Sequence, residues 1–123
     1  MQERATKQKQ VITDVLAQAE RPLTVPELLS LGQNLLPKLG VATVYREINR
    51  LCESGKLHTV TIPGDPPRYE MAHHHHHHFK CTECDRVYEL EGCSKGIESM
   101  VPKGFELQSH DITLYGLCSH CRA

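Results

Sequence analysis

Two Cys-x-x-Cys pairs constrain the fold of this chain more than any other feature. The first pair is Cys81 and Cys84, and the second is Cys118 and Cys121. A gap of two residues lets both thiolates of a pair turn toward one ion, so two pairs complete a tetrahedral, all-sulfur zinc site. Such a site leaves no open position for substrate or water, which makes it structural rather than catalytic. We therefore expect Zn²⁺ to tie the C-terminal segment back onto the residues around Cys81.

Length and composition favour small domains that need a metal or a partner for stability. The 123 residues suffice for one ordinary domain or two very small ones, and only 5% of them are aromatic. No apolar run approaches the ~20 residues that span a bilayer, and the N-terminus has no signal-peptide core. We expect a cytoplasmic protein with no membrane partner, where cysteine pairs bind metal rather than form disulfides. Cys52 is interpreted as a helix core residue, and the role of Cys93 stays open.

Residues 1–66 are expected to form a winged helix-turn-helix domain. Apolar residues recur at helical spacing, and Thr24 with Glu27 has the form of a capping box. Helical patterns cover residues 3–19, 24–36 and 41–54, and a β-hairpin pattern covers 56–62 and 68–71, with a Pro-rich turn at 63–67. In that layout the second helix of the turn lies in the DNA major groove. Any other small helical domain is the alternative, because eight Lys/Arg against six Asp/Glu in residues 1–63 do not by themselves predict DNA binding.

Residues 67–123 are expected to form a small α/β domain with the cysteine pairs at its edge. Strand patterns cover residues 73–79 and 86–91, a helix pattern covers 94–101, and 105–117 suits one strand or a bent pair of strands. This part of the chain is the more acidic one, since residues 64–123 hold nine Asp/Glu and six Lys/Arg. The overall fold class is therefore α+β, with two domains of different character.

Six consecutive histidines, His73 to His78, lie just before the first cysteine pair. Such a run is also used as an affinity tag, but tags sit at chain termini and this run is internal. In a strand, successive side chains point to opposite faces, and neighbours on one face are about 6.6 Å apart. His74, His76 and His78 would then share one face, and His73, His75 and His77 the other. One strand could in this way supply two different metal sites.

Other ligands and the absence of catalytic motifs point to metal binding without catalysis. Candidates for completing the two sites are His58, Glu70 and Glu89 on one side and Glu98 and His110 on the other. Mixed nitrogen and oxygen ligands accept Zn²⁺, Fe²⁺, Mn²⁺ or Ni²⁺, and the sequence does not rank them. The chain has no His-Glu-x-x-His, no Gly-x-Ser-x-Gly and no phosphate-binding glycine loop. We therefore expect no enzyme and no small organic substrate.

Over nearly its whole length the chain resembles the ferric uptake regulator family of metal-dependent transcriptional repressors. The motifs that carry the resemblance are Arg4-Ala-Thr-Lys-Gln8, Val41-Ala-Thr-Val-Tyr-Arg46, Arg68-Tyr-Glu70, the histidine run with Cys81-x-x-Cys84, and His110 followed by Leu114-Tyr-Gly-x-Cys118-x-x-Cys121. The resemblance implies a homodimer that binds a palindromic DNA operator when its regulatory metal site is loaded, and that controls metal homeostasis.

The resemblance also assigns residues. It places Thr43, Tyr45 and Arg46 at the DNA. It implies a regulatory site with the ligands His58, Glu70, His76, His78 and Glu89. It implies a second site in the dimerisation domain with the ligands His75, His77, Glu98 and His110.

The resemblance favours the zinc-sensing branch, and hence control of zinc uptake, without deciding it. His58 is placed as in zinc sensors, and Pro22 stands where iron and peroxide sensors usually carry a histidine. Glu70, however, stands where zinc sensors often have a cysteine. The regulatory ion is accordingly Zn²⁺, or Fe²⁺ or Mn²⁺. An iron-, manganese- or peroxide-sensing regulator is one alternative, and a His-rich zinc-buffering or metal-delivery protein is the other.

Overall fold

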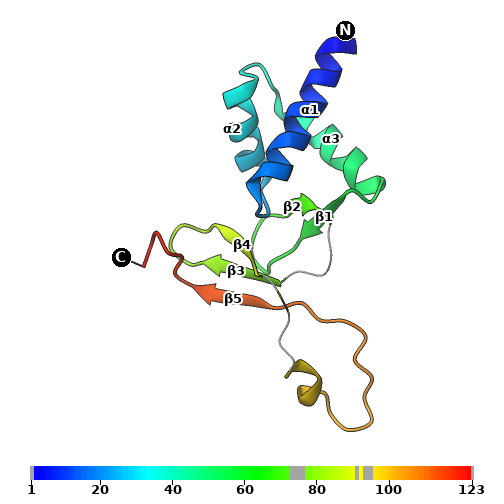
Figure 1. Cartoon of the computed structure of the whole chain (residues 1–123), viewed down its shortest axis with the longest axis vertical. Coiled ribbons are helices and arrows are strands. Elements are labelled where there is room, and N and C mark those ends of the chain that lie inside the picture. Colours follow the sequence, from blue (N-terminus) through cyan, green and yellow to red (C-terminus); the bar gives the residue numbers. More distant parts are fainter. Residues whose placement is uncertain (1, 73–76, 91, 93–95, 123) are drawn as a thin grey trace. The chain divides into compact units, whose positions relative to one another are not determined.

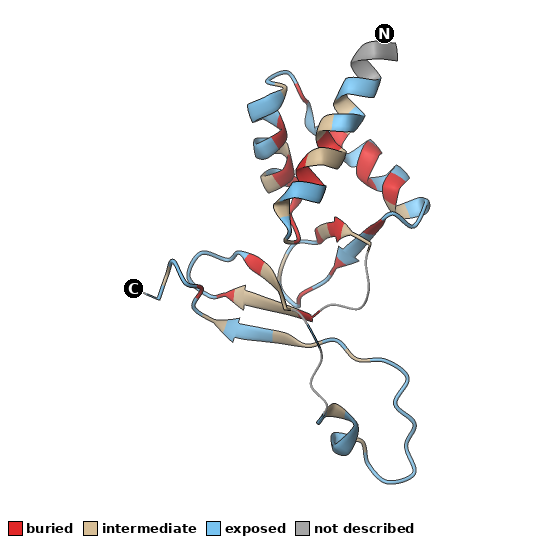
Figure 2. Ribbon diagram, in the orientation of Figure 1, coloured by how far each residue is buried: buried red, intermediate tan, exposed pale blue. Residues whose placement is uncertain are grey.

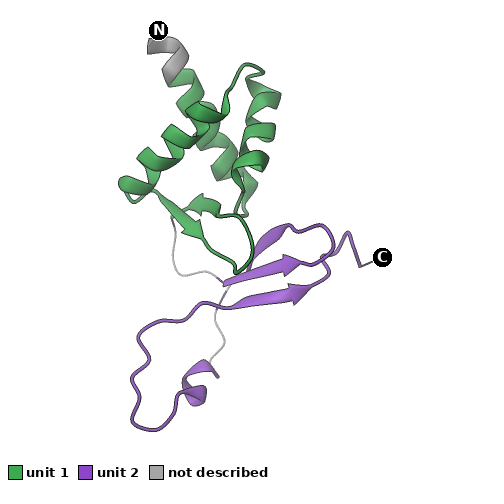
Figure 3. Ribbon diagram, turned by 180° about the vertical axis from the view of Figure 1, so that it is seen from behind, with its two compact units in different colours: residues 1–73 green, residues 74–123 purple. Residues whose placement is uncertain are grey.

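The computed structural model describes residues 2–72, 77–90, 92 and 96–122, with side chains from residue 6 onward. The chain divides into two compact units, Met1–His73 and His74–Ala123 (Figure 3). The division falls later than the predicted boundary at 66/67, because the strand over residues 68–71 pairs with the strand over 57–60 and so belongs to the first unit. Cys93 and the histidines from His73 to His76 lie outside the described residues.

The first unit begins with the three helices that the sequence predicts: α1 (Gln2–Ala19), α2 (Val25–Leu35) and α3 (Val41–Glu53) (Figure 1). The predicted capping box starts α2. The Thr24 hydroxyl accepts the N–H of Glu27 at 3.3 Å, and the Glu27 carboxylate accepts the N–H of Thr24 at 2.9 Å. A salt bridge of 2.9 Å from Arg21 holds the same carboxylate. The local sequence therefore fixes where the helix-turn-helix pair starts.

An antiparallel hairpin of β1 (Leu57–Val60) and β2 (Arg68–Met71) completes the first unit as the predicted wing. Leu23, in the connection between α1 and α2, pairs with Tyr69 through two backbone hydrogen bonds of 2.9 and 2.8 Å. Arg68 closes the intervening turn through a 2.7 Å salt bridge to Asp65, and both side chains are largely buried. The hairpin is thus fastened to the helices by backbone pairing as well as by side chains.

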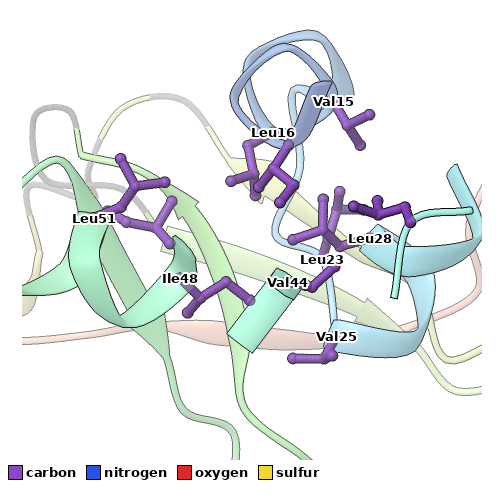
Figure 4. Packing of buried hydrophobic residues seen from close by; sticks show 11 residues of the cluster. Val15, Leu16, Leu23, Val25, Leu28, Val44, Ile48 and Leu51 are labelled. Carbon is purple, nitrogen blue, oxygen red and sulfur yellow. The ribbon is translucent and has the colours of Figure 1, made fainter. Parts of the chain in front are cut away.

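One apolar cluster fills the space between the helices and the hairpin (Figures 2 and 4). Its fully buried members come from α1, α2, α3 and β1 and from the connections between them. They are Ile12, Val15, Leu16, Leu23, Val25, Leu28, Leu39, Val44, Ile48, Leu51 and Leu57. Cys52 is half-buried against this cluster, as expected for a helix core residue. The first unit is therefore held together by ordinary hydrophobic packing.

The second unit is a three-stranded sheet in the order β4-β3-β5 (Figure 1). Strand β3 (His77–Cys81) lies in the middle, antiparallel to β4 (Val87–Leu90) and parallel to β5 (Thr113–Gly116). These three strands confirm parts of the predicted patterns at 73–79, 86–91 and 105–117. The α+β fold class, with three N-terminal helices followed by strands, is confirmed as a whole.

Two predicted elements of the second unit were wrong in extent. Of the helix expected over 94–101, the described residues form only a short 3₁₀ helix, η1 (Ile97–Met100), and none of its side chains is buried. A helix gains most of its stability by packing an apolar face, which η1 does not do. Of the strand expected over 105–117, only residues 113–116 form a strand, which pairs with β3. A strand forms where a neighbour satisfies its backbone groups.

The second unit buries few apolar side chains. Among its described residues, the buried hydrophobic ones are Cys81, Val87 and Cys118, two of which are cysteines of the predicted zinc site. Apolar side chains at Phe105, Leu114 and Tyr115 are instead between 50% and 71% exposed. This unit cannot rely on a hydrophobic core of its own. In the described part of the chain, no helix is long and apolar enough to cross a membrane.

Two leucines of α2 test the packing of the first unit. We expect Leu28→Ala to destabilise the protein by about 2–5 kcal/mol, because Leu28 is fully buried and its removal leaves a cavity. Leu35→Ala should change stability by about 0.5 kcal/mol or less, because Leu35 on the same helix is 62% exposed. Urea unfolding of the zinc-loaded protein measures both, and equal losses would contradict the described packing.

Candidate functional site

The four cysteines come together at one end of the second unit's sheet. Cys81 is the last residue of β3, and Cys118 follows β5 by two residues. The two strands run parallel, with Cys81 directly opposite Gly116, so their carboxyl ends meet at the same edge. The Gly116 carbonyl accepts the N–H of Thr82 at 2.8 Å, which extends the pairing beyond the strands. Parallel pairing therefore brings two motifs 37 positions apart within reach of one ion.

The sulfur positions fit a tetrahedral metal ion. One ligand atom from each of Cys81, Cys84, Cys118 and Cys121 lies within 4.8 Å of all the others. The Sγ atoms of Cys84 and Cys118 are 3.9 Å apart. Tetrahedral Zn–S bonds of about 2.3 Å would place two sulfurs about 3.8 Å apart. The residues present thus match the donor set and the size of a structural zinc site, as the spacing predicts.

Backbone N–H groups support a thiolate at Cys81. The amides of Cys84 and Cys118 point at the Cys81 sulfur at 3.5 and 3.4 Å, and they lower the pKa of this thiol to about 6. Hydrogen bonds to the charged form favour it, and a metal binds thiolate rather than thiol. Asp85 makes the turn possible by adopting a positive φ of 63°, where its N–H donates to the Cys81 carbonyl at 3.0 Å.

The second cysteine pair has a tyrosine beside it that the sequence did not single out. The Tyr88 hydroxyl lies next to Cys118 and is the main cause that lowers the pKa of that thiol. The same neighbour, with burial, raises the pKa of Tyr88. The pKa of Cys121 is raised to about 12, chiefly by hydrogen bonding to Cys118 and Cys81. Because a metal ion binds thiolates, its binding would release protons from the cluster.

Helix α3 carries the residues that the resemblance places at DNA. It buries Val44, Glu47, Ile48 and Leu51 against the core and leaves Tyr45 and Arg46 exposed on the other side. The Arg46 guanidinium donates to the Thr43 hydroxyl at 3.2 Å, so these two residues act as one polar group. An exposed arginine and tyrosine on the second helix of a helix-turn-helix suit contact with base edges and backbone.

The residues proposed for the regulatory site form one cross-strand pair in each unit. In the first unit His58 on β1 lies directly opposite Glu70 on β2. In the second unit His78 on β3 lies directly opposite Glu89 on β4. Residues in such register have Cβ atoms about 4.5–5.5 Å apart on the same face of the sheet. Each unit therefore places one imidazole opposite one carboxylate, although the Glu70 carboxylate is buried (7% exposed). His76 lies outside the described residues.

The residues proposed for the second site are only partly brought together. His77 is 3% exposed and stacks on His110, with ring centroids 5.1 Å apart and the planes inclined by 28°. The N–H of Ile112 donates to His77 Nδ1 at 3.0 Å. A neutral imidazole has one acceptor nitrogen, so His77 must give up this hydrogen bond before it can bind a metal ion. Glu98 is exposed on η1, and His75 lies outside the described residues.

Within the described residues, the four cysteines are the only group of three or more metal-ligating side chains that share one position. The ligand sets proposed for the other two sites stay predictions. Beyond Tyr88, sequence reasoning also passed over the basic residues Lys9 and Arg50, which lie beside Thr43 and Arg46 in one surface hollow. Their signal in the sequence is weak, because isolated basic residues on a helix face are common on any solvated surface.

Comparison with known proteins identifies the family. Residues 1–115 match the sequence profile of the Ferric uptake regulator family. The ferric uptake regulation protein of Campylobacter jejuni is 31% identical over 122 residues, which span 94% of this chain and 78% of that protein. The zinc uptake regulation protein of Mycobacterium tuberculosis is 30% identical over 124 residues, which span 98% of this chain and 95% of that protein.

A solved structure extends the likeness to the fold. The structure titled "zinc-bound manganese uptake regulator" superposes with a TM-score of 0.78 at 27% identity, covering 90% of this chain and 87% of that one. The chain therefore belongs to the ferric uptake regulator family of metal-responsive transcriptional regulators, which are not enzymes. Iron and zinc regulators are about equally similar to it, so the comparisons leave the branch undecided.

Removal of one cysteine tests the structural zinc site. We expect wild-type protein to retain one zinc per chain after dialysis against a mild chelator, and Cys84→Ser to lose it, because three sulfurs no longer close the tetrahedron. Cys52→Ser is the matched control, since Cys52 lies on α3. Elemental analysis reports the stoichiometry and thermal unfolding reports the consequence. Retention of the tightly held zinc by Cys84→Ser would remove this assignment.

Proposed function

We propose that this protein is a repressor that binds a palindromic operator as a homodimer when its regulatory site holds Zn²⁺, and that it controls zinc uptake. The observation that carries the proposal is the pair His58 and Glu70 on the wing of the same unit that exposes Tyr45 and Arg46 on α3. The proposed metal ligands and the proposed DNA-binding residues thus belong to one compact unit, which supports an ion acting on the placement of the recognition helix.

The proposed mechanism is a shift in population between arrangements of the two units. One unit supplies His58 and Glu70, and the other supplies His78 with His76 and Glu89. An ion that takes ligands from both units stabilises the arrangement in which all of them reach it. In a homodimer this arrangement would set two recognition helices about 34 Å apart, one turn of DNA. Coupling of about 1–3 kcal/mol would change DNA affinity about 5–150-fold.

The proposal of zinc as the regulatory ion rests on the ligand set, because membership of the family does not decide which metal is bound. His58 on the wing and Pro22 before α2 favour a zinc sensor, whereas the Glu70 carboxylate also suits Fe²⁺ and Mn²⁺. An iron-, manganese- or peroxide-sensing role is the alternative within the family. Because imidazole must be neutral to bind metal, occupancy should fall below about pH 6.5 whichever ion is used. We propose that the protein acts in the cytoplasm, where cysteines stay reduced and can bind metal.

The exposed apolar side chains of the second unit support the proposed homodimer. They lie on η1, in the segment before β5, on β5 and directly after it: Met100, Phe105, Leu107, Leu114, Tyr115 and Leu117. Strand β5 is a sheet edge with two of these residues on it, and an uncovered apolar edge promotes association. A second copy of this chain is the proposed partner, because a palindromic operator requires two-fold symmetry in the protein.

DNA binding at controlled free metal tests the proposed function. Duplexes selected from a random library by the zinc-loaded protein supply the operator, and fluorescence anisotropy measures its affinity. We expect tight binding that one metal switches on, and loss of the metal response in the double variant His76→Ala and His78→Ala. Arg46→Ala should weaken binding by about 10-fold or more, because a bidentate arginine contact is worth about 1–3 kcal/mol. Metal binding without any DNA binding would favour the metal-buffering alternative.

Sedimentation equilibrium tests the homodimer. We expect Leu114→Glu to raise the dimer dissociation constant about 100-fold or more, because an unpaired carboxylate in an apolar interface costs several kcal/mol. Leu35→Glu is the control, because Leu35 is a comparably exposed leucine (62% against 50%) in the first unit. Equal effects of the two substitutions would place the interface elsewhere.

A further inference from the structure

An open hollow of about 350 Å³ lies on the first unit between α1 and α3. Its lining combines two residues of α1 with four of α3: Gln8, Lys9, Thr43, Arg46, Glu47 and Arg50. Three of the six are cations and one is an anion. The hollow lies beside the exposed face of α3 and shares Thr43 and Arg46 with it. The other four lining residues are not among those that the resemblance places at the DNA.

A buried carboxylate holds one of the cations in place. Glu47 is only 4% exposed although it lies on the recognition helix. It accepts hydrogen bonds from Nε of Arg50 at 3.0 Å and from Nη2 of the same guanidinium. A carboxylate removed from water is costly unless a cation pairs with it, so Arg50 is drawn against the helix rather than extended into solvent. The pairing raises the pKa of Arg50 further.

The paired arginine still has donors for an anion. A guanidinium carries five N–H groups in a planar fork, and Glu47 takes those of Nε and one of Nη2. The two N–H groups of Nη1 lie on the far side of the fork from the carboxylate. Arg46 donates to the Thr43 hydroxyl at 3.2 Å, and Lys9 adds an ammonium group from α1. Side chains already ordered lose less entropy when they bind.

We propose that this hollow binds one phosphodiester group of the DNA backbone, with Arg50 and Lys9 as its ligands and Glu47 as the positioning residue of Arg50. The inference rests on the proposed function and adds residues to it. The ligand is a DNA phosphate rather than a free anion, because a helix that enters the major groove has the sugar-phosphate backbone along its flank. Phosphate contacts of this kind fix the register of the recognition helix while Tyr45 and Arg46 face the bases.

The salt dependence of DNA binding tests the two ligands. Fluorescence anisotropy with a mixed-sequence duplex and with the selected operator, at several salt concentrations and with zinc present, gives the slope of log K against log [salt]. We expect the double variant Lys9→Ala and Arg50→Ala to reduce this slope by about 0.9 per bound protomer, which corresponds to one lost phosphate contact. The effect should be similar on both duplexes, because the contact carries no sequence information.

A matched double variant controls for the loss of positive charge. Lys7 and Lys38 line a different hollow, together with Leu36 and Pro37, on the same unit. Lys7→Ala with Lys38→Ala removes as many positive charges as the test variant, and it should leave the slope within about 0.3 of the wild-type value. Equal reductions in both double variants would mean that only the general charge of the unit matters and would overturn the proposed site.

Variants of Glu47 separate positioning from simple structural support. Removal of a negative charge near DNA should by itself strengthen binding. We expect Glu47→Leu to weaken binding about 5-fold or more, because Arg50 is no longer oriented. Glu47→Gln keeps an oxygen acceptor for Nε of Arg50 and should restore wild-type affinity or exceed it. Thermal unfolding verifies that both variants are folded. Glu47→Leu protein that is folded and binds as tightly as Glu47→Gln would refute the positioning role.

The DNA-binding measurements distinguish an error in the phosphate site from an error in the proposed function. If wild-type protein binds operator in response to metal and the Lys9 and Arg50 variant keeps the wild-type slope, the phosphate site is wrong and the regulator stands. If wild-type protein binds neither duplex at any metal concentration, both proposals fall together.

Discussion

Four sulfur atoms within 4.8 Å of one another join the distant parts of the second unit at a position that suits one metal ion. Strand β3 and the segment after β5 are far apart in the sequence, and few apolar side chains are buried between them. An ion with four thiolate ligands would supply the stabilisation that a hydrophobic core supplies in larger domains. The sheet then positions His78 on β3 opposite Glu89 on β4.

The first unit is stabilised by different means. Its three helices and its hairpin share one apolar cluster, and backbone pairing between Leu23 and Tyr69 fixes the wing to the helices. Because the wing and the recognition helix belong to the same packed body, an ion held at His58 and Glu70 cannot move one without the other. The first unit is thus stabilised by packing, whereas the second unit buries few apolar side chains and carries four cysteines that fit a metal ion.

Hydrogen bonds hold the charged side chains of the recognition helix α3 in place, which its sequence does not indicate. Arg46 is bonded to Thr43, and Arg50 is bonded to the buried Glu47. Glu47 lowers the positive charge of the surface, which by itself would weaken attraction to DNA. Glu47 offsets this loss of attraction by orienting Arg50, because a paired guanidinium offers its remaining N–H groups in a fixed direction. Affinity for DNA would then depend on where a few cations are held rather than on the modest net charge of the unit.

The sequence by itself determined the features that depend on neighbours along the chain or on spacing. The capping box at Thr24, the three helices, the wing hairpin and the two Cys-x-x-Cys pairs are all local patterns with a direct physical reading, and the structure confirms them. Tertiary structure alone decided that residues 105–112 lie outside the strand that residues 113–116 form beside β3, because strand pairing depends on which strand is within reach. It also decided that β2 belongs to the first unit, that Ile112 donates to His77, and that Glu47 is buried against Arg50. Such contacts depend on packing and hydrogen bonds in three dimensions, so the pattern of polar and apolar residues along the chain does not predict them.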